Sequence, residues 1–290
     1  YCAGDDDQAI YVWAGASPKE FIHLESGAEV LSQSYRVPKT PHKIAQSIIK
    51  QISKPNRFPK EYDPAEKEGE VVRLSGIPFD KMNEGNWLIL AQCAFMLKEV
   101  EEEMRTHGYF FEKQGVPSVS VSALLAIKGW EKLRKGGSVN KQTAQKIYKM
   151  MSGNGKQIKR GKKAIYGDDL EMFSYEDLKE NHGLLVELDI IWREALNLIP
   201  EELESYIVSL LKKKEKLGEK PRISLSTIHG AKGAECDNVV VLTDISASSE
   251  RETRYNQDSL HRLFYVAVTR TRESLFLLYP DDPEKSYLIV

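Results

Sequence analysis

Apolar and polar positions alternate along this chain with two periods, one typical of buried strands and one typical of amphipathic helices. Residues 87–92 (WLILAQ) are almost continuously apolar, as in a strand that is covered on both faces. After Thr40, Ile44, Ile48 and Ile52 recur at every fourth position, which predicts a helix with one buried side. Strands that alternate with helices indicate a parallel sheet flanked by helices. The expected strands are 70–75, 87–92, 222–230, 238–244 and 274–280, with a short strand and loop within 109–121 and a strand running into a turn within 28–38. The expected helices are 17–21, 40–52, 94–106 and 257–272.

The pattern changes in the middle of the chain, where nearly every segment between about residues 123 and 218 has the spacing of a helix. A glycine- and lysine-rich loop, SGNGKQIKRGKKAIYGDD (152–169), interrupts these helices. We therefore expect residues 28–127 and 218–290 to form two parts of one α/β domain. A helical insertion subdomain at 128–217 separates them.

Charge is unevenly distributed over the 290 residues, although the formal net charge is only −2. From Lys128 to Lys163 there are twelve Lys or Arg residues and one acid, Glu131, so this stretch carries +11. Such a run binds a phosphate backbone without sequence preference, or forms the solvated face of surface helices.

Three widely spaced cysteines form neither a metal-ligand pattern nor a disulfide framework. This cysteine usage is typical of the cytoplasm or of another reducing, DNA-containing compartment. No apolar run reaches the length of a membrane span, so no membrane partner is expected.

Four short segments carry polar and charged residues beside predicted strand ends or on a following helix. Together they supply arginines, a lysine, a histidine, a glutamine and glycine-rich backbone, which suits a polyphosphate ligand. In a doubly wound sheet such a ligand binds outside the carboxyl ends of the strands. Taken singly, each segment has an ordinary structural explanation, such as a solvated turn or a charge that complements a helix dipole. The four are GDDDQAIYVWAGA (4–16), QSYRVP (33–38), STIHGAKGAECDNVVV (226–241) and RLFYVAVTRTRESL (262–275).

In this order and spacing, the four segments resemble motifs III, IV, V and VI of the superfamily 1 DNA helicases of the UvrD, PcrA and Rep type. The resemblance extends over nearly the whole chain and implies a RecA-like, P-loop NTPase-type fold. It also implies that residues 1–27 are the end of a first RecA-like domain and that the second RecA-like domain follows. Ala14 departs from the family pattern, which usually has arginine at that position.

The resemblance implies a nucleotide site shared with the first RecA-like domain. Gln8 is expected to contact the γ-phosphate or the attacking water, and Arg36 and Arg270 are expected to act as arginine fingers. Tyr35 is expected to stack on adenine, and Glu235 to bind the ribose. Gly233 belongs to the same ATP-binding group.

The DNA-binding residues implied by the resemblance are Tyr11 and Trp13, where single-stranded DNA passes, with Thr227 and His229 coupling this track to the nucleotide site. Lys159 and Lys162, from the basic stretch, are added as contacts to DNA. Single-stranded and duplex DNA are therefore the expected partners, together with the first RecA-like domain.

No GxxxxGK followed by Ser or Thr occurs in the sequence: Gly155-Lys156 precedes Gln157, and Gly161-Lys162 precedes Lys163. ATP and Mg²⁺ are the expected cofactors, with most ligands in a preceding domain and no metal ligand assigned here. The chain begins at Tyr1, so we interpret it as part of a longer protein and expect it to be inactive as an ATPase by itself.

The leading interpretation is the C-terminal motor domain of an ATP-dependent 3′→5′ DNA helicase that acts in DNA repair or replication. The alternative is a non-catalytic module that binds nucleic acid or docks a protein and keeps the helicase-like fold. A helicase–nuclease subunit is a third possibility, although no nuclease domain follows motif VI in this sequence.

Overall fold

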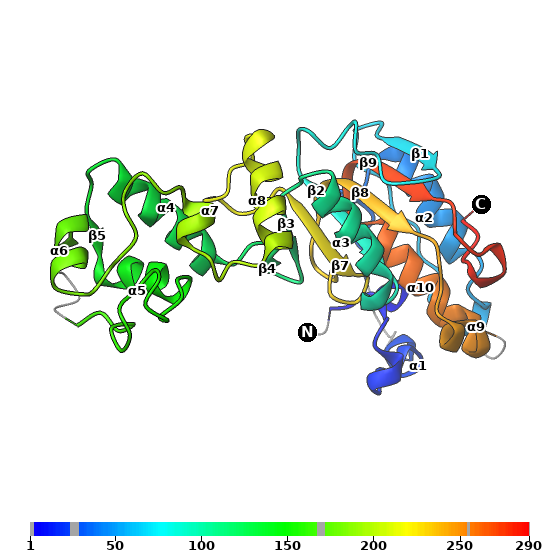
Figure 1. The fold of residues 1–290 in the computed structure, drawn as a ribbon. Coiled ribbons are helices and arrows are strands. Elements are labelled where there is room, and N and C mark those ends of the chain that lie inside the picture. Colours follow the sequence, from blue (N-terminus) through cyan, green and yellow to red (C-terminus); the bar gives the residue numbers. More distant parts are fainter. Residues whose placement is uncertain (1–2, 24–28, 167–171, 254–255, 290) are drawn as a thin grey trace. The chain divides into compact units, whose positions relative to one another are not determined.

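The computed structural model describes residues 3–23, 29–166, 172–253 and 256–289 (Figure 1). The chain divides into two compact units. The first contains Tyr1–Met104, Phe111–Val116 and Arg222–Val290, and the second contains Arg105–Phe110 and Pro117–Pro221. The second unit overlaps the insertion that the sequence predicts at 128–217 and also includes α4 (Val121–Arg134) in full.

The first unit is built on a seven-stranded sheet with the order β1-β9-β8-β2-β7-β3-β4, and every pair from β1 to β3 is parallel. The predicted α/β architecture is therefore confirmed. The strands are β1 (Glu70–Leu74), β2 (Trp87–Ala91), β3 (Phe111–Lys113), β4 (Val116–Pro117), β7 (Ile223–Thr227), β8 (Cys236–Leu242) and β9 (Thr271–Leu278). The α-helices of this unit are α1 (Pro18–Ile22), α2 (Lys39–Ile49), α3 (Leu97–Thr106), α9 (Ala247–Thr253) and α10 (Gln257–Val268). The last two residues of α3 lie beyond the boundary of the unit at Met104. The 3-10 turns are η1 (Asp6–Gln8), η2 (Val12–Ala14), η3 (Lys54–Asn56), η4 (Ala94–Met96) and η5 (Pro283–Lys285).

Helices cover both faces of this sheet, which explains why its central strands are so apolar. All five residues of β2 are buried, as the continuous run WLILA predicts. Figure 1 shows α3 in front of the strands and α2 and α10 behind them. Because side chains alternate along a strand, Leu88 and Leu90 share one face with Ile48 of α2 and Phe264 of α10 in a single buried cluster.

The C-terminal helix is shorter than its hydrophobic pattern predicts, and this corrects the position of two arginines. α10 ends at Val268, and β9 begins at Thr271. The Thr269 hydroxyl donates to the Tyr265 and Val266 carbonyl oxygens and so satisfies acceptors at the helix end. Arg270 and Arg272 therefore lie at the start of a strand rather than on the last turn of a helix.

The segment predicted as a strand within 28–38 is also different. Its described part forms only one isolated bridge, between Gln33 and Asp63, and no strand. The Ser34 hydroxyl accepts a hydrogen bond from the Val37 amide and closes a tight turn instead.

The second unit is mainly helical and also contains a two-residue antiparallel ladder that the helical pattern did not predict. Its core holds the fully buried Trp130, whose indole N–H donates to the Ile190 carbonyl at 3.0 Å. A Cβ on Gly129 would lie 2.4 Å from a Thr143 methyl, so this glycine lets α4 and α5 approach closely. Besides α4, the elements are β5 (Val139–Asn140), α5 (Lys141–Lys149), β6 (Met172–Phe173), α6 (Tyr175–Glu180), α7 (Trp192–Ala195) and α8 (Glu201–Lys212).

In the described ranges, no helix combines the length and the apolar character needed to cross a bilayer.

Removing a buried ring from α10 tests this description of the core. Phe264 is fully buried and stacks on Tyr287 with 4.3 Å between ring centroids. We expect Phe264→Ala to lower the free energy of unfolding by about 3–5 kcal/mol, because it leaves a cavity. Urea denaturation measures the change. Phe95→Ala is the matched control, since Phe95 is 68% exposed, and it should change stability by at most about 0.5 kcal/mol. Equal losses in the two variants would contradict the assignment.

Candidate functional site

Three consecutive carboxylates near the start of the chain form a buried cluster with two cations. Asp6 and Asp7 are almost completely buried in η1, and the Asp5 side chain accepts a hydrogen bond from the Asp7 amide. Lys60 Nζ lies 3.1 Å from Asp5 Oδ1 and 3.0 Å from Asp7 Oδ2, and it also bonds Asp6. Arg57 donates to both oxygens of Asp7, at 2.9 and 3.0 Å. Two cations therefore offset most of the charge of the three carboxylates, and the segment is not a freely solvated turn.

Gln8 and Arg270, separated by 262 residues in sequence, meet beside this cluster. Gln8 Nε2 donates to Asp5 Oδ2 at 2.6 Å, and Gln8 Oε1 accepts from Arg270 Nη2 at 3.4 Å. Lys232 Nζ donates to the Gln8 carbonyl at 2.9 Å. Two residues that the resemblance assigns to one nucleotide site are thus in contact.

Arg270 is 1% exposed, and its guanidinium is held mainly by backbone oxygens. It donates to the Val266 carbonyl at 2.9 Å and to the Ala234 carbonyl at 3.3 Å. Burial, together with the nearby charge of Arg36, lowers the pKa of Arg270 to about 10. The group remains a cation at neutral pH, and an added negative charge beside it would be stabilised.

Arg36 lies in the turn that Ser34 closes, and its charge is close to that of Arg270. Its Nη1 lies 3.6 Å from Glu235 Oε2, and its Nε is buried without a hydrogen-bond partner. A buried donor of this kind is costly unless a ligand completes it. The neighbouring Tyr35 ring is 91% exposed and offers an open face.

Glu235 is the carboxylate of an arginine cluster that consists of Arg36, Arg270 and Arg272. It bonds Arg272 as well as Arg36, and the Arg272 hydrogen bond holds the pKa of the Glu235 carboxyl below its usual value. Gly233, two residues earlier, has φ of +90°, a left-handed conformation that favours glycine.

The aromatic residues of the N-terminal segment pack against His229. The Tyr11 hydroxyl donates to the His229 carbonyl at 3.1 Å, and His229 Nε2 lies 3.0 Å from the Ile10 carbonyl oxygen. The ring centroids of Trp13 and His229 are 6.3 Å apart, and Trp13 is 75% exposed. Thr227 is the last residue of β7, and its hydroxyl accepts from the Gly230 amide at 3.0 Å.

These groups occupy both edges of the sheet, which differs from the expected position outside the carboxyl ends. Thr227 ends β7, whereas Glu235 and Arg270 directly precede β8 and β9, which run in the same direction. Residues 228–235 therefore lead from the carboxyl edge back to the amino edge. The N-terminal segment follows them in the opposite direction, since Gln8 contacts Lys232 and Ile10 contacts His229.

Lys159 and Lys162 belong to the second unit and are described with that unit alone. Both are exposed, and the Lys159 amide donates to the Gly183 carbonyl at 2.9 Å, which fixes the loop. The loop also carries exposed Lys156, Arg160 and Lys163.

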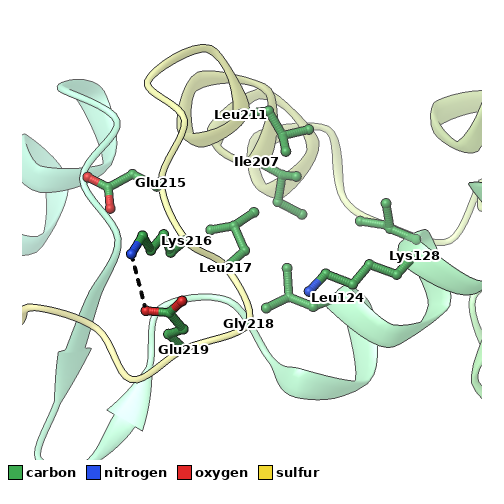
Figure 2. Close-up of a pocket in the computed structure, with 10 residues that line it drawn as sticks. Leu124, Lys128, Ile207, Leu211, Glu215, Lys216, Leu217, Gly218 and Glu219 are labelled. Carbon is green, nitrogen blue, oxygen red and sulfur yellow. Dashed lines mark ion pairs between the residues drawn. The ribbon is translucent and has the colours of Figure 1, made fainter.

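The second unit has a separate hollow of about 530 Å³ between α4, α8 and the segment after α8 (Figure 2). Leucine and isoleucine side chains form most of its wall, and a Lys216–Glu219 ion pair at 3.7 Å lies on it. None of the predicted site residues lines it.

The arginine cluster fits an anionic ligand. Arg36 and Arg272 pair with the Glu235 carboxylate, Arg270 lies near enough to feel its charge, and one Arg36 donor has no partner. The Asp5–Asp7 carboxylates come within 4.8 Å of one another, as in a cation site, but Lys60 already bonds all three.

Sequence reasoning missed Lys60, Arg57, Lys232 and Arg272 as parts of this arrangement. Their side chains reach the site from segments without a recognisable motif, or from positions in a motif to which no role was given. The signal for Lys60 and Arg57 was indirect: three adjacent aspartates need cations nearby if the fold buries any of them, as it does Asp6 and Asp7.

The mostly parallel sheet with helices on both faces has the architecture of an α/β RecA-like fold. Residues 138–281 match the family described as UvrD-like helicase C-terminal domain. The chain therefore carries a UvrD-like C-terminal domain, and the family prediction is confirmed.

A curated relative supports this assignment. The chain is 22% identical over 382 aligned positions to a "Probable DNA helicase II homolog" of Rickettsia conorii, and the alignment covers the whole chain. The chain spans 58% of the length of this relative.

The ion pair of Glu235 predicts a measurable titration. We expect the Glu235 carboxyl to titrate below its ordinary pKa, and Arg272→Gln to move that pKa upward, because the ionised form loses its donor. Since the folded-state pKa is depressed, the stabilising effect is present above the unfolded-state pKa and is lost as pH falls through the folded value. Carboxyl ¹³C NMR follows the titration. Arg251→Gln, at an exposed position, is the control. A Glu235 pKa that is the same in wild type and in Arg272→Gln would contradict the assignment.

Proposed function

We propose that this chain is the C-terminal motor domain of an ATP-dependent 3′→5′ DNA helicase. The contact between Gln8 and Arg270 is the observation that carries the proposal, because these side chains come from opposite ends of the chain and meet beside Arg36 and Glu235. The direction of movement follows from the family resemblance. DNA repair or replication, in a reducing compartment, is the setting that we propose.

ATP is the proposed ligand of the arginine cluster. Arg36 and Arg270 would balance negative charge on its phosphates, the exposed Tyr35 ring would stack on adenine, and Glu235 with Gly233 would lie along the sugar. A triphosphate supplies the free energy of phosphoryl transfer, and guanidinium groups stabilise the charge that develops during that transfer. Gln8, oriented between Asp5 and Arg270, would position the attacking water.

The Walker A and Walker B residues and the Mg²⁺ ligands belong, in this proposal, to a first RecA-like domain that supplies the other wall of the nucleotide site. The 290 residues contain no Walker A sequence. We propose that segment 4–16 is the junction between the two domains. Its contacts with residues 229–232 join the nucleotide side of the site to the aromatic side.

Single-stranded DNA is the proposed ligand of the aromatic group. Trp13 presents most of its ring to solvent, while Tyr11 and His229 support it from behind. An exposed ring on a fixed backbone is a platform for a base, and stacking of this kind does not depend on sequence.

Replacement of Arg36 tests the nucleotide half of the proposal. In the longer protein that joins this chain to Walker A and Walker B residues, we expect Arg36→Ala to lower kcat for ATP hydrolysis by roughly 10³-fold or more, because a charge that stabilises the transition state is lost. A steady-state ATPase assay measures it. Lys39→Ala is the matched control, since Lys39 lies three residues away and pairs with Glu68. An Arg36→Ala protein within tenfold of wild type would refute the role.

Replacement of Trp13 tests the DNA half. We expect Trp13→Ala to weaken binding of an oligothymidylate to the 290-residue chain by about 1–3 kcal/mol, which is roughly 5- to 150-fold. Trp13→Tyr should keep most of the affinity because it keeps a ring. Fluorescence anisotropy gives both constants, and Tyr279→Ala, at another exposed aromatic, is the control.

The alternative function, a non-catalytic module that binds nucleic acid, is favoured by the exposed cations of the loop at 156–163. The same titration separates the two. If neutralising Lys159, Lys162 and Lys163 abolishes binding and its salt dependence while Trp13→Ala does nothing, the basic loop is the binding surface and the aromatic track is wrong. Neutralising Lys43, Lys50 and Lys212, which are also exposed, controls for net charge.

A further inference from the structure

Lys60 contacts all three carboxylates of the N-terminal cluster, and Asp5 is the one that leads to the candidate nucleotide site. One oxygen of Asp5 lies 3.1 Å from Lys60 Nζ, and the other accepts the Gln8 amide at 2.6 Å. The far side of the Gln8 amide then meets Arg270 at 3.4 Å. The four side chains form a continuous series, Lys60–Asp5–Gln8–Arg270.

The orientation of the Gln8 amide follows from the chemistry of its neighbours. An ionised carboxylate only accepts hydrogen bonds, and a guanidinium only donates them. The NH₂ group of Gln8 must therefore face Asp5, and its carbonyl oxygen must face Arg270. Any change that moves Asp5, or removes its charge, also removes the reason for this orientation.

Lys60 is the cation that pairs with Asp5 and holds its side chain in place. Its side chain is 15% exposed, and burial alone would lower its pKa, but Asp5 and Asp7 raise the pKa overall. The ammonium therefore stays charged among three carboxylates that would otherwise repel one another. Arg57 is close to Lys60 in sequence, but its guanidinium donates two hydrogen bonds to the Asp7 carboxylate.

We propose that Lys60 is a positioning residue for Gln8, acting through Asp5 to determine which side of the Gln8 amide meets Arg270. Its importance for nucleotide hydrolysis rests on the function proposed above, whereas the contact itself does not. Arg57 contributes to the stability of the segment without orienting Gln8. The two cations thus have separable effects, although both are buried in one cluster.

The side-chain amide signals of glutamine in ¹⁵N NMR of the 290-residue chain test this inference. Gln8→Ala identifies the Gln8 signal by its loss. In wild type we expect one Gln8 amide proton to be shifted downfield and protected from solvent exchange by its bond to a carboxylate. Lys60→Met should raise its exchange rate about tenfold or more, while Arg57→Met should change it less than about twofold. Thermal unfolding of both variants shows whether each cation also contributes to stability.

Two further variants separate positioning from a general structural role. Lys60→Arg keeps a cation beside Asp5 and should restore the protected signal, at least in part. Asp5→Asn keeps Lys60 and the shape of the side chain but removes the charge, so the Gln8 signal should lose its protection even if Lys60→Met does not fold.

The inference is overturned if Lys60→Met and Asp5→Asn leave the Gln8 signal unchanged. It is also overturned if Arg57→Met abolishes the protection as completely as Lys60→Met, since the cluster would then hold the segment only as a whole. These spectra are recorded without nucleotide. A loss of the proposed ATPase function would therefore not alter them, and failure of one proposal is distinguishable from failure of the other.

Discussion

The pairing of three adjacent carboxylates, two of them buried, with Lys60 and Arg57 is the interaction on which the candidate site depends. Residues 4–16 contribute only Ile10 to the buried core, so apolar contacts hold this segment weakly. Removing one partner of a buried ion pair typically costs about 3–5 kcal/mol, because an uncompensated charge stays behind. The charge cluster therefore fixes a segment that would otherwise be a loose extension. With it, Gln8, Tyr11 and Trp13 are presented to the rest of the domain.

Residues 228–235 run beside segment 4–16 and connect the two groups of the candidate site. These residues lead from the end of β7 to the start of β8, and Gln8 and Ile10 contact them on the way. The exposed aromatic group and the arginine cluster are consequently joined by two adjacent stretches of backbone. A shift at one edge of the sheet has a direct covalent route to the other. If the chain acts as the motor domain proposed above, this connection offers a route by which the two groups could be coupled.

Much of the fold could be predicted because its determinants are local. WLILA is typical of a strand covered on both faces, and the four-residue spacing of Ile44, Ile48 and Ile52 indicates a helix with one buried side. Predictions were wrong where tertiary contacts decide. Arg270 was placed on a helix because VAVTR continues the helical pattern, but the chain turns at Thr269 and joins β9. The segment within 28–38 has the composition of a strand, but in its described part only Gln33 forms a β-bridge, with Asp63.

The sequence by itself determined the class of this protein, since motif order and hydrophobic period are properties of the linear chain. It also named Gln8, Arg36, Arg270 and Glu235 through their motifs. Only the tertiary structure decided that Gln8 faces Arg270, that Lys60 holds Asp5, and that Arg270 and Arg272 lie at the amino end of β9. The physical reason is that buried charges choose partners by distance in space, and residues 5 and 60 or 8 and 270 carry no local signal of each other.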